Sequence, residues 1–166
     1  LLPNSAINSA VIGMLSMPDR LPDAVRLFEE LKKWDLETCN VMISCYARSG
    51  LVEQALGLFV MALQNGVLPT EFTFANVLRW SSCFGLLKQG GQIHALVYKC
   101  GFEDDMIVAT ALIDMYCKLG SLKHVRKLFN GVCAKDLLLW NTMVVGISQN
   151  GKGREAIPIT EAEASY

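Results

Sequence analysis

Two stretches of the sequence decide the fold: residues 39–50, CNVMISCYARSG, and residues 140–151, WNTMVVGISQNG. Asparagine, methionine and glycine recur in them at the same places, 101 residues apart, as Asn40 and Asn141 show. A fixed spacing between similar segments indicates a repeat protein, in which each repeat buries its apolar face against the next one.

Shorter steps divide this long period. Gly50, Gly85, Gly120 and Gly151 are spaced 35, 35 and 31 residues apart. A second landmark gives spacings of 31, 35 and 35 residues, and its members are Leu27-Phe28, Leu58-Phe59, Ile93-His94 and Leu128-Phe129. Both landmarks predict the same repeats, which are 5–35, 36–70, 71–105, 106–136 and an incomplete one at 137–157. Residues 158–166 begin with a proline and form a tail that does not resume the pattern.

Apolar residues within a repeat follow a helical period. Leu112, Ile113 and Tyr116 share one helix face, and Gly120 followed by Ser121 is typical of a helix stop and the N-cap of the next helix. Each repeat is therefore predicted to be a pair of helices, and neighbouring pairs must stack to bury their apolar faces. We predict an all-α fold, an α-solenoid. A single globular bundle is the alternative, and it explains the helices but not the shared spacing.

Composition limits the kinds of partner. The chain has 166 residues, of which 52% are hydrophobic, enough to build a sizeable core. With 15 Lys and Arg against 16 Asp and Glu, the net charge is -1, so a global basic field is missing. Any nucleic-acid binding must therefore use a local basic stripe or base-specific contacts. No apolar run approaches the length that spans a bilayer, and we expect no membrane partner.

The N-terminus reads LLPNSAINSA, without an initiator methionine or the charged and apolar regions of a signal peptide. We interpret the chain as a fragment in which any transit segment is absent.

Cysteine and histidine raise the question of a metal or catalytic site. No two cysteines are spaced as C-x-x-C, and we predict reduced structural thiols at Cys39, Cys45, Cys83, Cys100, Cys117 and Cys133. His94 takes the place that phenylalanine holds in other repeats, so it is predicted to pack. The zinc-deaminase pattern H-x-E with P-C-x-x-C is absent, as are the other catalytic patterns. We predict no metal, no cofactor, no small-molecule substrate and no enzyme activity.

The repeats resemble a known family. The segments GGQIHALVYKCGF (90–102), TALIDMYCKLGSL (110–122) and LLLWNTMVVGISQNG (137–151) resemble the pentatricopeptide repeat proteins, and more narrowly the plant subgroup whose repeats alternate in length. The resemblance covers residues 5–157. It implies a right-handed superhelix of tetratricopeptide-like helix pairs that binds single-stranded RNA, one base per repeat.

The resemblance also implies which residues read the bases. In this family the fifth and last residues of a repeat are the main readers, and here they are Ser9 with Asp35, Asn40 with Thr70, Ala75 with Asp105, Thr110 with Asp136, and Asn141 in the incomplete repeat. Family behaviour links Ser or Thr plus Asp to guanine and Asn to pyrimidines, which predicts the target 5′-G-pyrimidine-any-G-pyrimidine-3′. Ala75 has no polar group and leaves the third place open. The alternative is that these are ordinary polar residues near helix starts.

Two further places in the repeat carry expectations. The second residue tends to be apolar and to sandwich the base, which fits Ala6, Phe72, Ile107 and Leu138, whereas Glu37 departs from the pattern. The thirteenth residue is often a lysine near the phosphate, and Arg48 and Lys118 match it. Basic residues late in a helix also suit the helix dipole, which is the alternative explanation. So few cations predict a shallow salt dependence.

Two classes of function follow. The first is sequence-specific binding of single-stranded organellar RNA for RNA editing or processing, with other editing factors as further partners. The second is a protein-binding scaffold, because the concave surfaces of solenoids also hold peptides. We expect a mitochondrial location, with the chloroplast as the alternative.

Overall fold

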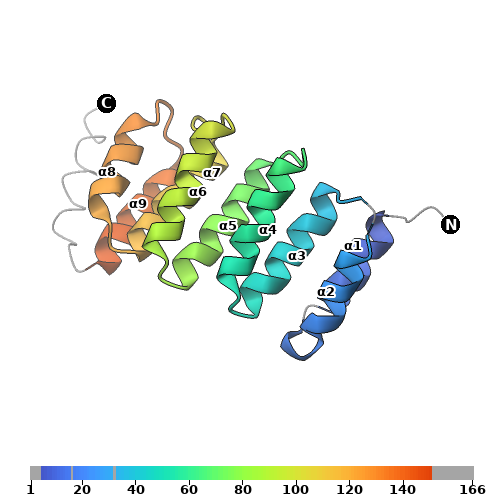
Figure 1. The fold of residues 1–166 in the computed structure, drawn as a ribbon. Coiled ribbons are helices and arrows are strands. Elements are labelled where there is room, and N and C mark those ends of the chain that lie inside the picture. The colour runs from blue at the N-terminus through green and yellow to red at the C-terminus, as the bar shows by residue number, and fades with distance from the viewer. Residues whose placement is uncertain (1–4, 16, 32, 151–166) are drawn as a thin grey trace. The chain divides into compact units, whose positions relative to one another are not determined.

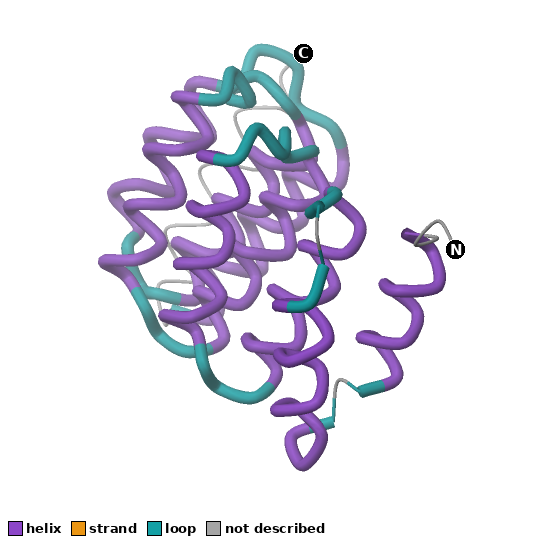
Figure 2. The backbone as a smooth tube through the Cα atoms, turned by 45° about the vertical axis from the view of Figure 1, so that its right-hand side comes forward, coloured by secondary structure: helices purple, strands orange, loops and turns teal. Residues whose placement is uncertain are grey.

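The computed structural model describes residues 5–15, 17–31 and 33–150, which form helices joined by short loops and contain no strand (Figures 1 and 2). The chain divides into two compact units, Leu1–Val77 and Leu78–Tyr166, called here the N-terminal and C-terminal units. None of the helices in the described ranges is long and apolar enough to cross a membrane.

The N-terminal unit is a stack of antiparallel helices. It holds α1 (Ser5–Met14), the short 3-10 helix η1 (Pro18–Arg20), α2 (Leu21–Glu29), α3 (Leu36–Arg48), α4 (Val52–Gln64) and the first half of α5 (Glu71–Cys83). Helix α3 packs against α1, α2 and α4, so its inner face is covered on several sides (Figure 1). The core is formed by buried apolar side chains that include Ile12, Phe28, Met42, Phe59 and Phe74.

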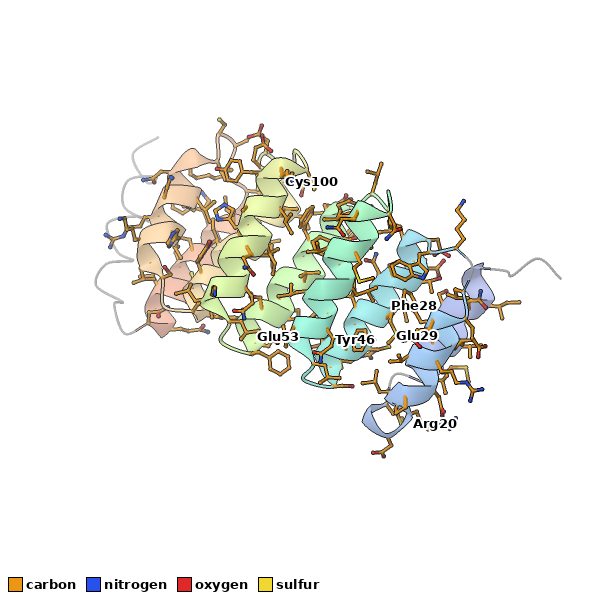
Figure 3. The ribbon with its side chains drawn as sticks, viewed as in Figure 1. Arg20, Phe28, Glu29, Tyr46, Glu53 and Cys100 are labelled. Atoms are coloured by element: carbon orange, nitrogen blue, oxygen red, sulfur yellow. The ribbon has the colours of Figure 1, made fainter. Side chains whose placement is uncertain are left out.

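Aromatic contacts link these helices. The rings of Phe59 and Phe74 meet edge to face at 5.5 Å between centroids, a geometry that adds to the free energy of burial. Phe28 on α2 lies 5.0 Å from Trp34 between ring centroids. Burial, followed by the carboxylate of Glu29, raises the pKa of Tyr46 on the facing helix α3 (Figure 3).

The C-terminal unit repeats the arrangement. It contains the rest of α5, then α6 (Leu87–Lys99), α7 (Met106–Lys118), α8 (Leu122–Gly131) and α9 (Leu137–Gln149). Helix α7 packs against α6, α8 and α9 and is buried by them. Its core residues include Ile93, Ile113, Met115, Val125 and Met143, each at most 1% exposed.

The first helix of each pair begins at a regular interval. Helices α1, α3, α5, α7 and α9 begin at residues 5, 36, 71, 106 and 137, which are the first residues of the predicted repeats. The prediction of an all-α fold made of helix pairs is confirmed. The use of the repeat boundaries as domain limits stays a prediction. The end of the incomplete repeat and the tail, residues 151–166, lie outside the described residues.

Glycines with positive φ end several helices, which explains why the spacing of glycine in the sequence matches the repeat. Gly120 has a φ of +70°, which is costly for residues with a Cβ. Its N–H donates to the carbonyl of Cys117 at 3.0 Å, and the next N–H, of Ser121, donates to that of Tyr116 at 2.8 Å. These two bonds form the Schellman motif that ends α7. Positive φ recurs in the turns at Gly50, Gly66, Gly85 and Gly101.

The predicted N-cap position of Ser121 is confirmed, but its side chain does not make the cap. Ser121 does occupy the N-cap position of α8, but its hydroxyl makes no capping bond to the backbone. The Ser121 Oγ instead lies 2.8 Å from Nδ1 of His124. The start of α8 therefore follows from the Schellman turn before it.

The cysteines are free thiols that differ in burial, with Cys100 half-buried. Cys39, Cys45 and Cys117 are buried as predicted for small apolar residues, whereas Cys83 and Cys133 are exposed. Burial, aided by Asp35 and Asp114 respectively, raises the pKa of the Cys39 and Cys117 thiols to about 11. These two thiols are therefore protonated and unreactive near neutral pH. No cluster of metal-binding side chains is found among the described residues.

A glycine controls how closely α9 approaches α7. A Cβ built at Gly146 would collide with the Sγ and Cβ atoms of Cys117. Both residues are buried, and the Cβ of Cys117 cannot rotate away because it is bonded to the backbone. Close packing of the two first helices in the C-terminal unit therefore requires glycine at this place.

We expect Gly146→Ala to destabilise the chain by about 1–3 kcal/mol, the usual cost of overpacking a core. The matched control is Gly57→Ala in the interior of α4, where an added Cβ meets nothing within 4 Å. That change should stabilise by about 0.5–1 kcal/mol, because alanine loses less backbone entropy in a helix. Urea unfolding of both variants measures the difference, and equal stabilities would contradict the packing argument.

Candidate functional site

The residues predicted to read bases occupy two fixed places in the fold. The fifth residue of each repeat lies in the opening turns of a first helix, and the last residue immediately precedes the next first helix. We call the fifth and last residues of one repeat a reading pair. Successive first helices pack together, α1 on α3 and α7 on α9. The members of the pair Ser9 with Asp35, and those of the pair Thr110 with Asp136, are therefore carried by the same ends of neighbouring helices.

Three of the last residues cap the helix that follows. The carboxylate Oδ1 atoms of Asp35, Asp105 and Asp136 accept from the backbone N–H of the third residue after each, at 2.9, 2.9 and 2.7 Å. Aspartate is among the best N-cap residues because it satisfies a donor that the helix leaves unpaired. In Asp105 and Asp136 the cap uses one oxygen, and no bond to Oδ2 is found within the described ranges.

In the first reading pair, Ser9 is hydrogen-bonded to a side chain outside the pair. Ser9 is 4% exposed, and its hydroxyl donates to Oε1 of Glu37 at 2.9 Å. Glu37 is the residue that departs from the apolar pattern at the second place of its repeat. The glutamate at this place therefore has a structural role, because its carboxylate accepts the hydroxyl proton of Ser9, the predicted reader. A role for Ser9 in reading stays a prediction.

The second reading pair is joined through a third residue. The Nδ2 atom of Asn40 donates to Oγ1 of Thr73 at 3.2 Å, and the hydroxyls of Thr73 and Thr70 are 3.2 Å apart. Thr73 also accepts from the backbone N–H of Thr70 at 3.2 Å. The structure thus brings Asn40 and Thr70 together around Thr73, a contact that was not predicted from the sequence. The only signal in the sequence was threonine at the third place of two successive repeats, as Thr38 and Thr73.

The later predicted readers face fewer constraints. The hydroxyl of Thr110 is half-buried and donates to the carbonyl of Met106 in its own helix at 2.8 Å. Its oxygen keeps lone pairs that can accept a further bond. Asn141 is exposed on α9. No hydrogen bond among the described residues joins Thr110 to Asp136, so this pair is not held together as Asn40 and Thr70 are.

Apolar side chains are exposed at the second place of the repeats. Phe72 in the N-terminal unit is 61% exposed, and Ile107 and Leu138 in the C-terminal unit are 41% and 62% exposed. Large apolar residues at one recurring phase of a helix usually face the core, so their exposure indicates a contact surface. Glu37 is exposed at the same place, and the side chain of Ala6 lies outside the described part.

The two predicted phosphate-binding cations are on the surface. Arg48 is exposed, with Nε 3.4 Å from the carbonyl of Ser44. Lys118 is paired with Asp114, four residues earlier on α7, at 2.6 Å between Nζ and Oδ2. An exposed pair of this kind is worth about 0–1 kcal/mol, so it does not prevent Lys118 from binding an anion.

A cavity of about 650 Å³ lies elsewhere, between α6, α7 and α8. Met106, Ala109 and Leu112 line it from α7. Neither Ile107 nor Thr110 is among the residues that line it. The cavity is therefore distinct from the surface that carries the reading pairs.

His94 borders this cavity and belongs to an aromatic cluster. Its Nδ1 is 3.0 Å from the hydroxyl of Tyr116, and its ring lies 5.4 Å from that of Tyr98. The ring of His124 stacks on Tyr116 at 4.7 Å. Burial, followed by the charges of His124 and Lys127, lowers the pKa of His94 below 6.5. The folded chain therefore favours the neutral imidazole.

This lowered pKa makes stability depend on pH. As the pH falls below 6.5, the ordinary value for histidine, the unfolded chain binds a proton before the folded chain does. Stability is therefore complete above that pH and decreases as the pH falls toward the lower pKa of the folded state. We expect His94→Phe to remove this component, so that its unfolding free energy depends less on pH between 7.5 and about 5. Parallel pH profiles for both proteins would contradict the assignment.

Comparisons with known proteins agree with this geometry. The family model of the PPR repeat, the pentatricopeptide repeat, matches residues 37–67, 107–136 and 138–157. In Arabidopsis thaliana, pentatricopeptide repeat-containing protein At1g43980, mitochondrial, is 41% identical over 158 residues, which cover 95% of this chain and 25% of that protein. Pentatricopeptide repeat-containing protein At5g39680 of the same plant is 36% identical over 148 residues, covering 89% of this chain and 21% of that protein.

Solved structures share the fold. The crystal structure of the pentatricopeptide repeat protein PPR10 from maize matches with a TM-score of 0.74 at 19% identity, over 99% of this chain and 25% of that one. PPR10 in complex with an 18-nt psaJ RNA element matches with a TM-score of 0.67 at 21% identity, over 98% and 26%. This likeness confirms the predicted fold class, the α-solenoid of helix-pair repeats.

The chain spans about a quarter of the length of the curated relatives it matches. The names of these relatives describe repeats and state no enzymatic activity.

Proposed function

This chain belongs to the pentatricopeptide repeat family, and on that basis we propose that it binds single-stranded RNA sequence-specifically, one base per repeat, in organellar RNA editing or processing. Within the family we place it in the plant subgroup whose repeats alternate in length. Single-stranded RNA is recognised by stacking on bases and by bonds to their Watson–Crick edges, so the site must offer both.

The observation that carries this proposal is the pairing of an exposed apolar residue with a polar one three positions later. Ile107 and Thr110 are so related on α7, and Leu138 and Asn141 on α9. Residues three apart on a helix are neighbours on its surface. The apolar side chain supplies a platform for the face of a base, and the polar one reaches its edge.

The proposed target sequence is 5′-G-pyrimidine-any-G-pyrimidine-3′. The hydrogen bonds of the reading pairs indicate that its two guanines contribute unequally to binding. Guanine presents two N–H donors on its Watson–Crick edge. The Asp136 oxygen that has no bond within the described residues suits them as an acceptor. Ser9 gives its proton to Glu37, so the guanine at the first place should contribute less than the one read by Thr110 and Asp136. Ala75 leaves the third place without a preference.

Base substitution tests the reading. A labelled single-stranded RNA that contains 5′-GCAGC-3′ in an unstructured flank is compared with versions in which each guanine becomes adenine. We expect the change at the fourth place to weaken binding by at least about fivefold, as for the loss of one specific base contact, and the change at the first place to weaken it less. Affinity that is unchanged when both guanines are replaced would contradict the proposal.

A pair of variants separates reading from capping. Asparagine caps helices about as well as aspartate, so Asp136→Asn should keep the stability of α9. We expect it to reduce the preference for guanine over adenine at the fourth place, because the carboxylate acceptor is lost. Asp105→Asn is the matched control: it has the same cap, but its partner Ala75 has no polar group, so base preference should not change. Thermal melting and RNA titration of both variants measure the two effects.

Salt dependence tests the electrostatic part. Arg48 and Lys118 are the two cations at the phosphate-binding place, and the net charge is -1. Two phosphate contacts predict a slope of about -1.4 for the logarithm of the association constant against that of the salt concentration. A slope several times steeper would show that other cations hold the backbone.

Protein binding is the second candidate function. Ile7, Val11 and Met14 are spaced four and three residues apart on α1 and are 59%, 38% and 80% exposed. Such an apolar stripe suits a protein contact, including one with other editing factors. Competition between single-stranded RNA and double-stranded DNA distinguishes the two, since a protein-binding scaffold has no preference for the RNA.

We propose a mitochondrial location, with the chloroplast as the alternative. This proposal is supported by several relatives that are named as mitochondrial proteins, At1g43980 among them.

A further inference from the structure

Thr73 has an unusual number of polar contacts for a buried residue. It is 2% exposed and lies in the first turn of α5, at the third place of the repeat that follows Asn40 and Thr70. Its hydroxyl oxygen is 3.2 Å from Nδ2 of Asn40, 3.2 Å from the backbone N of Thr70 and 3.2 Å from Oγ1 of Thr70. One hydroxyl therefore touches both members of a reading pair.

Counting donors and lone pairs fixes the direction of these bonds. A hydroxyl has one proton to donate and two lone pairs to accept with. The side-chain amide of Asn40 and the backbone N–H of Thr70 are both donors, so they use the two lone pairs of Thr73. The proton of Thr73 must then be donated to Oγ1 of Thr70, because a third incoming donor would find no lone pair.

The direction of the network determines what the pair presents to a ligand. Asn40 has one N–H held by Thr73, which leaves its carbonyl oxygen as an acceptor and its second N–H as a donor. Thr70 receives the proton of Thr73, so its own hydroxyl proton is directed elsewhere. Both groups are thereby held in one orientation before a ligand binds, which lowers the entropy lost on binding.

The preceding repeat shows a related contact. Thr38 occupies the same third place, is fully buried, and donates its hydroxyl to Oδ2 of Asp35 at 3.0 Å, while its N–H donates to Oδ1 at 2.9 Å. Val108 and Leu139 stand at this place in the C-terminal unit and offer only a backbone N–H to Asp105 and Asp136. The third residue thus decides whether the last residue of the repeat before it is held at one point or two.

We propose that Thr73 is a positioning residue for base recognition: it orients Asn40 and Thr70 as one hydrogen-bonding group and thereby sharpens the selection of a pyrimidine at the second place of the target. The inference rests on the proposed function, because it concerns how the second reading pair selects its base. Thr73 touches no base itself and acts through Asn40 and Thr70.

A purely structural role makes a different prediction. Thr73 accepts from the N–H of Thr70, the residue before α5, in the manner of a capping box. If that were its whole role, loss of the hydroxyl would lower the melting temperature and leave base selection unchanged. Positioning predicts that base selection changes as well.

The experiment measures selectivity as the ratio of affinities for 5′-GCAGC-3′ and 5′-GAAGC-3′ RNA. We expect Thr73→Val, which keeps the shape and removes the hydroxyl, to reduce this ratio by about three- to tenfold, as for the loss of one hydrogen bond. Thr73→Ser keeps the hydroxyl and should preserve the ratio. Thr38→Val removes an equally buried hydroxyl one repeat earlier and should destabilise the chain without changing selectivity at the second place.

Two results would overturn the proposal: Thr73→Val with a lower melting temperature but wild-type selectivity, or Thr38→Val with the same loss of selectivity as Thr73→Val. If Thr73→Val does not fold, Thr73→Cys replaces the hydroxyl with a weaker hydrogen-bonding group, and a smaller reduction of the ratio is expected. Unchanged selectivity in that folded variant would also contradict positioning.

A measurement without RNA separates this inference from the proposed function. In NMR spectra the side-chain amide protons of Asn40 should shift and exchange faster with solvent in Thr73→Val and not in Thr73→Ser. If these shifts occur while the wild-type chain binds no RNA, the orienting network is supported and the proposed function fails. If the wild-type chain selects a pyrimidine while the amide signals of Asn40 do not respond to Thr73→Val, the proposed function is supported and the positioning role fails.

Discussion

The N-cap hydrogen bond at the start of three first helices, α3, α7 and α9, is the interaction on which the candidate site depends. The carboxylates of Asp35, Asp105 and Asp136 accept from a backbone N–H in the first turn of α3, α7 and α9. The cap does more than begin a helix, because it holds the last side chain of one repeat at the end of the next first helix. That is the same end at which the fifth residue of the preceding first helix lies.

Capping and recognition are compatible because a carboxylate has two oxygens. In Asp136 one oxygen satisfies the helix and the other has no bond within the described residues. A negative charge is also stabilised at a helix N-terminus by the helix dipole. Serine could cap as well, but it would have a single oxygen to share between the helix and a ligand. The structural role therefore does not exclude the proposed one, and it fixes the place from which the carboxylate would act.

Neighbouring side chains alter what each pair can offer. Glu37 takes up the hydroxyl proton of Ser9, while Thr73 links Asn40 to Thr70. Both come from the first turn of the next first helix, at its second and third residues. A description of a reading pair by two residues is thus incomplete for this chain, since the following repeat contributes a side chain to each of the first two pairs.

The sequence by itself determined the helix pairs and their length, because glycine at positive φ and an N-cap residue are local requirements that leave a regular mark, as at Gly120 and Asp136. It also indicated the exposed apolar place at Phe72, Ile107 and Leu138, since these residues recur at one phase of the repeat. It did not reveal that Ser121 leaves its cap unused, that Cys83 and Cys133 are exposed, or that Thr73 joins a reading pair. Only the tertiary structure decided these, because Asn40 and Thr73 are 33 residues apart, and neither the rotamer of a serine nor the packing around a cysteine is specified by a local pattern.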